Sequence, residues 1–255
     1  MLFAAKFLLN VAPKFYICNV IMKKIHIVII VALVILADQA LKIYVKTSFT
    51  LDTEVPVLGN WFKLYYVENP GMAYGLKWGG AAGKLFLTIF RLIAVIFGTW
   101  YLSGIVKKGY SNGFIICAAL IYAGALGNLI DSCFYGMIFD KGMLLKTIEG
   151  EEQYVNYSGI AAFAKQGYAS LFHGNVVDMI HVEIIKTKLP TWVPFWGGKP
   201  FDFFGPIFNI ADAAISTGII SLLVFQKKLF PKAKIETNKQ TIETTTLVDD
   251  VSQVS

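Results

Sequence analysis

Four long apolar segments constrain this chain more than any other feature of its sequence. They span Ile25–Tyr44, Leu85–Val106, Phe114–Tyr135 and Ile207–Gln226. A helix that crosses ~30 Å of hydrocarbon needs about 20 apolar residues, and each segment meets that length. With 56% hydrophobic and 16% charged residues, the sequence predicts an all-α polytopic membrane protein with four transmembrane helices. A soluble enzyme, a disordered chain and a coiled coil are excluded.

The apolar segments divide the chain into three parts. Residues 22–226 form the predicted four-helix membrane domain, with loops at 46–84 and 136–206. Residues 1–21 are an N-terminal extension, a weak further helix or an upstream start, because Met22-Lys23-Lys24 also resembles a natural beginning. Residues 227–255 are polar and rich in threonine, which predicts a disordered tail.

Lysine pairs flank the apolar segments at Lys23-Lys24, Lys107-Lys108 and Lys227-Lys228. The positive-inside rule places these flanks, and hence both termini, in the cytoplasm. The two long loops are then extracytoplasmic, and they carry the aromatic residues typical of a membrane interface. This topology accounts for the net charge of +6, so we expect no nucleic-acid partner. The three cysteines lack the spacing of a metal site.

Several ionisable residues lie inside the predicted spans, where each costs about 2.5–3.5 kcal/mol on insertion scales. Four of them are compared by depth: Asp38, Arg91, Asp131 and Asp212. With a rise of about 1.5 Å per residue, all four fall in the outer third of the membrane. Independent structural charges have no reason to share a depth, so we interpret these residues as parts of one site.

A fifth candidate, Asp178, comes from the second extracytoplasmic loop. Residues 175–184 alternate as in a short β-strand, and Asp178 shares a face with Val176 and Ile180. A carboxylate in an apolar row is disfavoured as an anion, so the pKa of Asp178 is expected to rise. A second aspartate nearby would leave one carboxyl protonated and one ionised, the state in which aspartate pairs activate water.

Other interpretations of these residues stay open. Asp38 and Lys42 have the spacing of an intrahelical ion pair, and Asp131 could simply end the third helix. Asp212 has no Lys or Arg three or four residues away, which weakens a structural role. A small ion-coupled transporter would need charges along a path through the membrane, whereas these cluster on one side. A purely structural membrane protein would leave Asp178 and Asp212 replaceable.

Five motifs occur in order along the chain: Asp38–Lys42, Asn69–Gly75, Gly124–Asp131, Val176–Ile180 and Phe208–Asp212. Together they closely resemble those of bacterial lipoprotein signal peptidase, or signal peptidase II, over residues 22–226. The resemblance implies an intramembrane aspartic endopeptidase that removes the signal peptide from diacylglyceryl-modified prolipoproteins, cutting before the lipidated cysteine.

The resemblance implies that Asp178 and Asp212 are the catalytic pair, with one acting as base on water and the other as acid. Which aspartate holds the shared proton is open. The other implied residues bind substrate or support the site: Asn128 and Asn209 beside the pair as hydrogen-bond donors, Asn69 and Gly71 on a substrate-contacting loop, and Asp38, Lys42 and Asp131 around them.

The resemblance also implies partners and a location. The partners are prolipoprotein substrates, membrane lipid and cyclic peptide inhibitors such as globomycin, with no metal or cofactor. The location is the bacterial cytoplasmic (inner) membrane, with the active site toward the extracytoplasmic side. One chain supplies every proposed site residue, so a monomer is expected.

The chain departs from the family pattern at three places. Ser132 stands where the family commonly has arginine, and we hypothesise that Arg91, the only arginine in the sequence, replaces it from the neighbouring helix. Tyr74 replaces a usual phenylalanine. The loop after Asp131 is much longer than in the family, and its 136–172 part is either an inert insertion or a lid.

Overall fold

The computed structural model describes residues 2–71, 80–108, 110–192, 194–195, 197–203 and 205–229, with backbone alone for residues 2–23. Part of the second motif (residues 72–75, which include Tyr74) and the tail from residue 230 lie outside the described residues. All other candidate site residues lie within them.

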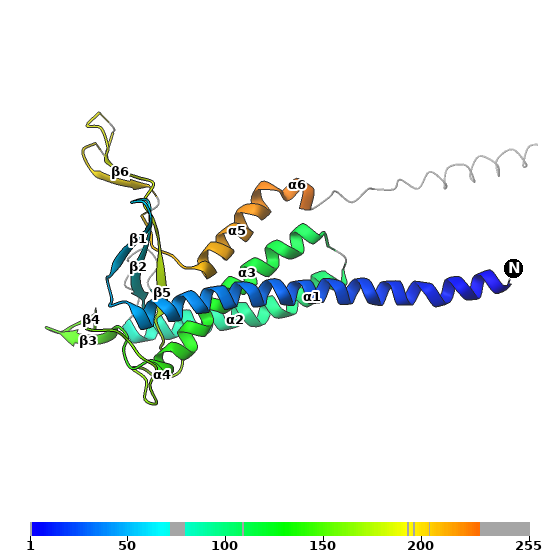
Figure 1. The fold of residues 1–255 in the computed structure, drawn as a ribbon, viewed down its shortest axis with the longest axis horizontal. Helices are drawn as coiled ribbons and strands as arrows, with labels where there is room; N and C mark the ends of the chain where they lie inside the picture. Colours follow the sequence, from blue (N-terminus) through cyan, green and yellow to red (C-terminus); the bar gives the residue numbers. More distant parts are fainter. Residues whose placement is uncertain are drawn as a thin grey trace, which may run out of the picture.

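Apolar helices make up most of the described chain (Figure 1). They are α1 (Leu2–Ser48), α2 (Gly80–Lys107), α3 (Asn112–Ile130) and α5 (Ile210–Val224), with short helices α4 (Gly136–Ile138) and α6 (Gln226–Leu229). A π-helical turn, η1 (Asp131–Tyr135), joins α3 to α4. Three stretches are long and apolar enough to cross a membrane: Lys24–Ser48, Gly80–Lys107 and Asn112–Ile138. This is a multi-pass membrane protein.

The fourth apolar helix is shorter than the sequence predicts. Helix α5 has 15 residues and, at about 1.5 Å per residue, is shorter than the hydrocarbon layer is thick. It begins at Ile210 because Phe208 is extended and bridges Ile180 of the neighbouring strand. Asn209 then caps the helix with its side chain. A fourth span remains a prediction.

The strands are more extensive than the small β-element expected from sequence. Strands β1 (Glu54–Leu58), β2 (Phe62–Asn69) and β5 (Val176–Val182) form an antiparallel sheet in the order β1-β2-β5. Two further hairpins pair β3 (Leu144–Ile148) with β4 (Glu151–Val155), and β6 (Ile185–Lys188) with β7 (Pro200–Phe203). Figure 1 shows the strands gathered at one end of the helices, with α6 and the α2–α3 connection at the other.

The strand predicted around Asp178 is confirmed as β5. Val176, Val177 and Met179 are buried, so β5 is covered on both faces. It lies beside β2 and follows directly after the end of the long loop. Helix α3 packs against α1, α2 and α5, and α1 also contacts β5, so the helices and the sheet meet at one end of the helices.

Candidate active site

Asp178 is held in a buried position on β5. Its side chain is 5% exposed, and its Oδ1 accepts a hydrogen bond of 2.7 Å from Asn209 Nδ2. Burial and the nearby carboxylate of Asp212 raise the pKa of Asp178 to about 7. The expected rise is therefore confirmed, and both predicted causes contribute to it.

Asp212 is placed by the first turn of α5. Asn209 and Asp212 form a reciprocal cap, in which Asn209 Oδ1 accepts from the Asp212 amide at 2.9 Å and Asp212 Oδ2 accepts from the Asn209 amide at 3.4 Å. The other oxygen, Oδ1, accepts from Asn128 Nδ2 at 2.8 Å. Asp212 is half-buried, so its surroundings are more open than those of Asp178.

Two asparagine amides link the two carboxyl groups. Asn209 Nδ2, which bonds Asp178, also lies 3.1 Å from Asn128 Oδ1 and 3.3 Å from the carbonyl of Val177. Asn128 Nδ2 bonds Asp212. Because the two protons on Asn209 Nδ2 already face three acceptors, this amide is occupied in orienting the aspartate pair and the strand beside it.

A buried lysine, Lys42, contacts this pair of amides. Lys42 Nζ forms ion pairs of 2.8 Å with Asp38 and 2.7 Å with Asp131, and it donates at 3.0 Å to Asn128 Oδ1. The predicted intrahelical pair of Asp38 with Lys42 is confirmed. The pair with Asp131 crosses from α1 to the end of α3, a contact that periodicity within one helix does not reveal.

The two carboxylates bound to Lys42 each reach an element that carries a catalytic candidate. Asp38 Oδ1 accepts from the amide of Ala211, directly before Asp212, at 2.9 Å. Asp131 Oδ2 accepts from the amide of Val177, directly before Asp178, at 3.4 Å. Asp131 does not end the helix, which continues through η1. Asp38 and Asp131 thus tether the start of α5 and the start of β5 to one cation.

Gln39 also takes part in this hydrogen-bond network, and it was not singled out from the sequence. Its Nε2 donates to Asp131 Oδ1 at 2.8 Å, and its Oε1 accepts from the hydroxyl of Tyr135 at 3.1 Å. The sequence offered one indication of this role, because Gln39 lies inside the Asp38–Lys42 motif. An amide between two charged residues inside a membrane needs hydrogen-bond partners of its own.

Arg91 contacts Ser132, the position at which the arginine common in the family is missing. Its Nη1 donates to Ser132 Oγ at 2.8 Å, and Ser132 Oγ donates to the carbonyl of Asn128 at 2.9 Å. The carboxylates of Asp178 and Asp212 are within electrostatic range of the guanidinium. No carboxylate within the described part of the chain lies within ion-pair distance of Arg91.

Comparison with known proteins identifies the family of this chain. The model of the family signal peptidase (SPase) II matches residues 30–227. This chain belongs to the signal peptidase II family. As a signal peptidase II it is a membrane protease, and the family recognised from the five motifs is confirmed.

Relatives of this signal peptidase II share most of its length. A lipoprotein signal peptidase of Porphyromonas gingivalis is 42% identical over 196 residues, which cover 76% of this chain and 80% of that protein. A lipoprotein signal peptidase of Amoebophilus asiaticus is 34% identical over 223 residues, 86% of this chain and 83% of that protein. A solved bacterial membrane enzyme is similar with a TM-score of 0.48 and 21% identity, covering 83% of this chain and 93% of that chain.

The substrate-contacting loop expected in a signal peptidase II starts at the end of β2. Asn69 Oδ1 accepts from the amide of Gly71 at 2.9 Å, and Gly71 has a φ of 104°, which favours glycine. Gly71 also lies against α2, because a Cβ there would be 3.1 Å from Leu87 Cδ2. The chain therefore turns tightly at Gly71.

A second buried network lies beside this turn and was missed from the sequence. Glu68 binds Lys46 of α1, and its Oε1 also accepts from the Tyr66 hydroxyl at 2.7 Å. Its Oε2 accepts from Asn175 Nδ2 at 2.7 Å and from the amide of Met143 at 2.9 Å. Burial alone raises the pKa of Glu68, but Lys46 and Asn175 outweigh burial and lower it. Through these contacts Glu68 attaches the long loop to β2 and to the start of β5.

Proposed function

We propose that this signal peptidase II is an aspartic endopeptidase whose catalytic residues are Asp178 and Asp212. The observation that carries the proposal is the amide bridge, in which Asn209 and Asn128 bind one carboxylate each and also each other. Such a bridge holds two carboxyl groups in fixed positions around one reaction centre. Because its pKa is raised, Asp178 can keep, near neutral pH, the one proton that a catalytic aspartate pair needs.

The chemistry follows from the different surroundings of the two aspartates. Asp212, half-buried and hydrogen-bonded as an acceptor, acts as the base that takes a proton from water. Protonated Asp178 donates to the scissile carbonyl oxygen as the water oxygen attacks the carbon. As the tetrahedral intermediate collapses, Asp212 passes its proton to the leaving amine and Asp178 recovers a proton from the hydroxyl that becomes the product carbonyl. Because water is the nucleophile, no covalent enzyme intermediate forms. We assign Asn128 and Asn209 a positioning role.

The substrate in this proposal is a prolipoprotein that carries a diacylglyceryl-modified cysteine. The relatives named lipoprotein signal peptidase support this substrate class. A site at the outer ends of membrane helices lets the signal helix and the acyl chains stay in lipid. Asn69, Gly71 and Arg91 are proposed to contact the substrate, and a cyclic peptide such as globomycin to compete for the same site.

We further propose four spans with both termini in the cytoplasm of a bacterial inner membrane, and a monomer as the active unit. The lysine flanks support the orientation. For the fourth span, α5 and α6 together cover residues 210–229 with one interruption, at Phe225. The transporter alternative is not supported, because the family is one of proteases.

The decisive experiment is a gel-shift processing assay with purified protein and a diacylglyceryl-modified prolipoprotein. Asp178→Asn and Asp212→Asn are each expected to lower the cleavage rate at least about a hundredfold, the usual range for loss of an acid or base. Asp140→Asn is the matched control, because Asp140 is exposed and remote from the pair. Full activity in either site variant, with folding verified by thermal unfolding, would overturn the assignment.

A further inference from the structure

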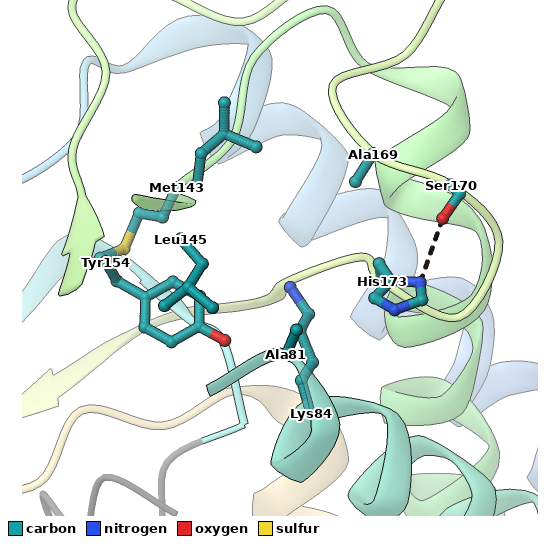
Figure 2. Close-up of a pocket in the computed structure, with 9 residues that line it drawn as sticks. Ala81, Lys84, Met143, Leu145, Tyr154, Ala169, Ser170 and His173 are labelled. Carbon is teal, nitrogen blue, oxygen red and sulfur yellow. Dashed lines mark hydrogen bonds between the residues drawn. The ribbon is translucent and has the colours of Figure 1, made fainter. Parts of the chain in front are cut away.

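A cavity outside the catalytic centre lies between α2, the β3–β4 hairpin and residues 169–173. Its volume is about 280 Å³. Figure 2 shows the amine of Lys84 pointing into the space between Tyr154 and His173. The aspartate pair does not line this cavity.

Lys84 is a buried cation that lacks a counter-ion among the described residues. Its side chain is 8% exposed, and its Nζ donates to the neutral amide oxygen of Asn175. None of the ion pairs found in the described chain includes Lys84, and Glu68 is already bound to Lys46. Because a buried charge without an opposite charge is costly, this position favours an incoming anion.

Other hydrogen-bonding groups line the same cavity. Burial and Glu152 raise the pKa of Tyr154, so its hydroxyl keeps the proton that it can donate. His173 Nδ1 lies 2.9 Å from the carbonyl of Leu171 and 3.1 Å from Ser170 Oγ, which fixes the imidazole ring at the rim. The hydroxyl of Tyr154 and the amine of Lys84 form a donor pair suited to an oxyanion, and the imidazole bounds the cavity beside them.

The cavity lies at one end of a membrane-spanning helix, and the proposed topology places it at the level of the membrane surface. Lys84 is in the first two turns of α2, at the end of the helix nearest the strands. Gly71 packs against the same turn, since a Cβ there would be 4.0 Å from Lys84 Cα. Phosphate groups of lipids occupy the interface at which a membrane helix ends, and Leu144 and Leu145 give the cavity an apolar side as well.

We propose that this cavity binds the phosphate group of a phospholipid from the outer leaflet, with Lys84 as its cation and the Tyr154 hydroxyl as a further donor. A bound lipid would then lie against the turn at Gly71, where the substrate-contacting loop begins. The site is separate from the proposed cleavage chemistry, so its test needs no protease activity.

The test is calorimetric titration of the full chain in non-ionic detergent with soluble dihexanoyl-phosphatidylglycerol. Lys84→Met is expected to weaken binding at least about tenfold, the effect of losing one charge-assisted hydrogen bond. Lys146→Met is the matched control, because Lys146 is an exposed lysine of β3. Unchanged binding by Lys84→Met would overturn the site. Dihexanoylglycerol, which lacks phosphate, is expected not to bind, and equal binding would also overturn it.

A second variant keeps the proposal testable if Lys84→Met does not fold. The exposed carboxylate of Glu152 lies against Gly80 at the start of α2. Glu152→Gln removes this negative charge and is expected to tighten phospholipid binding several-fold, whereas unchanged or weaker binding would count against an anion site. Inorganic phosphate is titrated alongside, and binding equal to that of the lipid would overturn the lipid as the source of the phosphate.

Discussion

Asp178 and Asp212 are chemically identical side chains in unlike surroundings. Asp178 sits on a strand covered on both faces, whereas Asp212 lies half-buried in the first turn of a helix, where its Oδ2 accepts from the amide of Asn209. Burial and the neighbouring carboxylate raise the pKa of Asp178, so we propose that Asp178 holds the shared proton.

The pH dependence of cleavage follows from the pKa of Asp178, raised to about 7. Since the active pair carries one proton, kcat/KM is expected to fall about tenfold per pH unit above pH 7. A raised native pKa also means that this group's contribution to stability is complete below its unfolded pKa of about 3.9 and is lost as pH rises through about 7. Cleavage rates measured from about pH 5 to about pH 9 test the predicted fall in kcat/KM. A value of kcat/KM that stays constant above pH 7 would contradict the prediction.

Arg91 provides a second prediction for a single side chain. Arg91→Ala is expected to lower processing roughly tenfold to a hundredfold, because it removes a charge-assisted hydrogen bond to Ser132 and a cation that interacts electrostatically with both aspartates. Adding Ser132→Arg to Arg91→Ala is expected to recover part of the rate in the same gel-shift assay. Normal processing by the single variant would refute the replacement hypothesis.

Helical and strand periodicity, a shared depth in the membrane and the five motifs identified most of the site from sequence, whereas the contacts of Gln39 and the network around Glu68 were missed. Asp38 with Lys42 follows from helical spacing, and Asp178 from alternation in a strand. Glu68 and Asn175 are far apart in sequence and meet only because β2 pairs with β5. Lys84 was not singled out from the sequence, and its burial in the fold is what distinguishes it.

Among the elements, α3 and α5 approach each other closely through glycines. A Cβ at Gly124 would lie 2.2 Å from the carbonyl oxygen of Ala211, and one at Gly218 would lie 2.8 Å from that of Cys117. Small residues let membrane helices pack this tightly. The contact at Ala211 is next to Asp212, so the spacing of these helices sets the position of a catalytic candidate.

Gly124→Ala is therefore expected to destabilise the protein by about 1–3 kcal/mol, as overpacking does, and to reduce cleavage by displacing Asp212. Gly104→Ala is the matched control, because a Cβ at Gly104 meets no atom within 4 Å. Thermal unfolding in detergent and the processing assay measure both effects. Wild-type behaviour of Gly124→Ala would show that the helices separate without cost.

Element boundaries were predicted least well where turns and pairing decide them. The β3–β4 hairpin was missed, although Glu149 and Gly150 between two β-prone runs have the positive φ angles of a tight hairpin turn. Helix α5 starts three residues later than expected because Asn209 caps it and Phe208 joins β5. Hydropathy alone predicts neither turn geometry nor strand pairing.

For the whole molecule, the arrangement of helices and strands makes the proposed orientation testable. The strands lie at one end, and the α2–α3 connection lies at the other (Figure 1). In a chain without its native cysteines, Glu151→Cys is expected to react with a membrane-impermeant maleimide in intact cells, because the proposed topology places β4 on the extracytoplasmic side. Asn112→Cys is expected to react only after permeabilisation. Both positions are exposed, so the reverse labelling pattern would invert the topology.

The tether from Asp38 to the amide of Ala211 joins the first helix of the chain to the last long one. During translation, α1 enters the bilayer long before Asn209 and Asp212 leave the ribosome. A nascent chain accordingly has Lys42, Asp131 and Asp178 in place but lacks the second aspartate. If Asp212 is catalytic as proposed, proteolytic activity begins only when synthesis reaches α5, and a ribosome-arrested chain ending before Asn209 is expected to leave a prolipoprotein uncut.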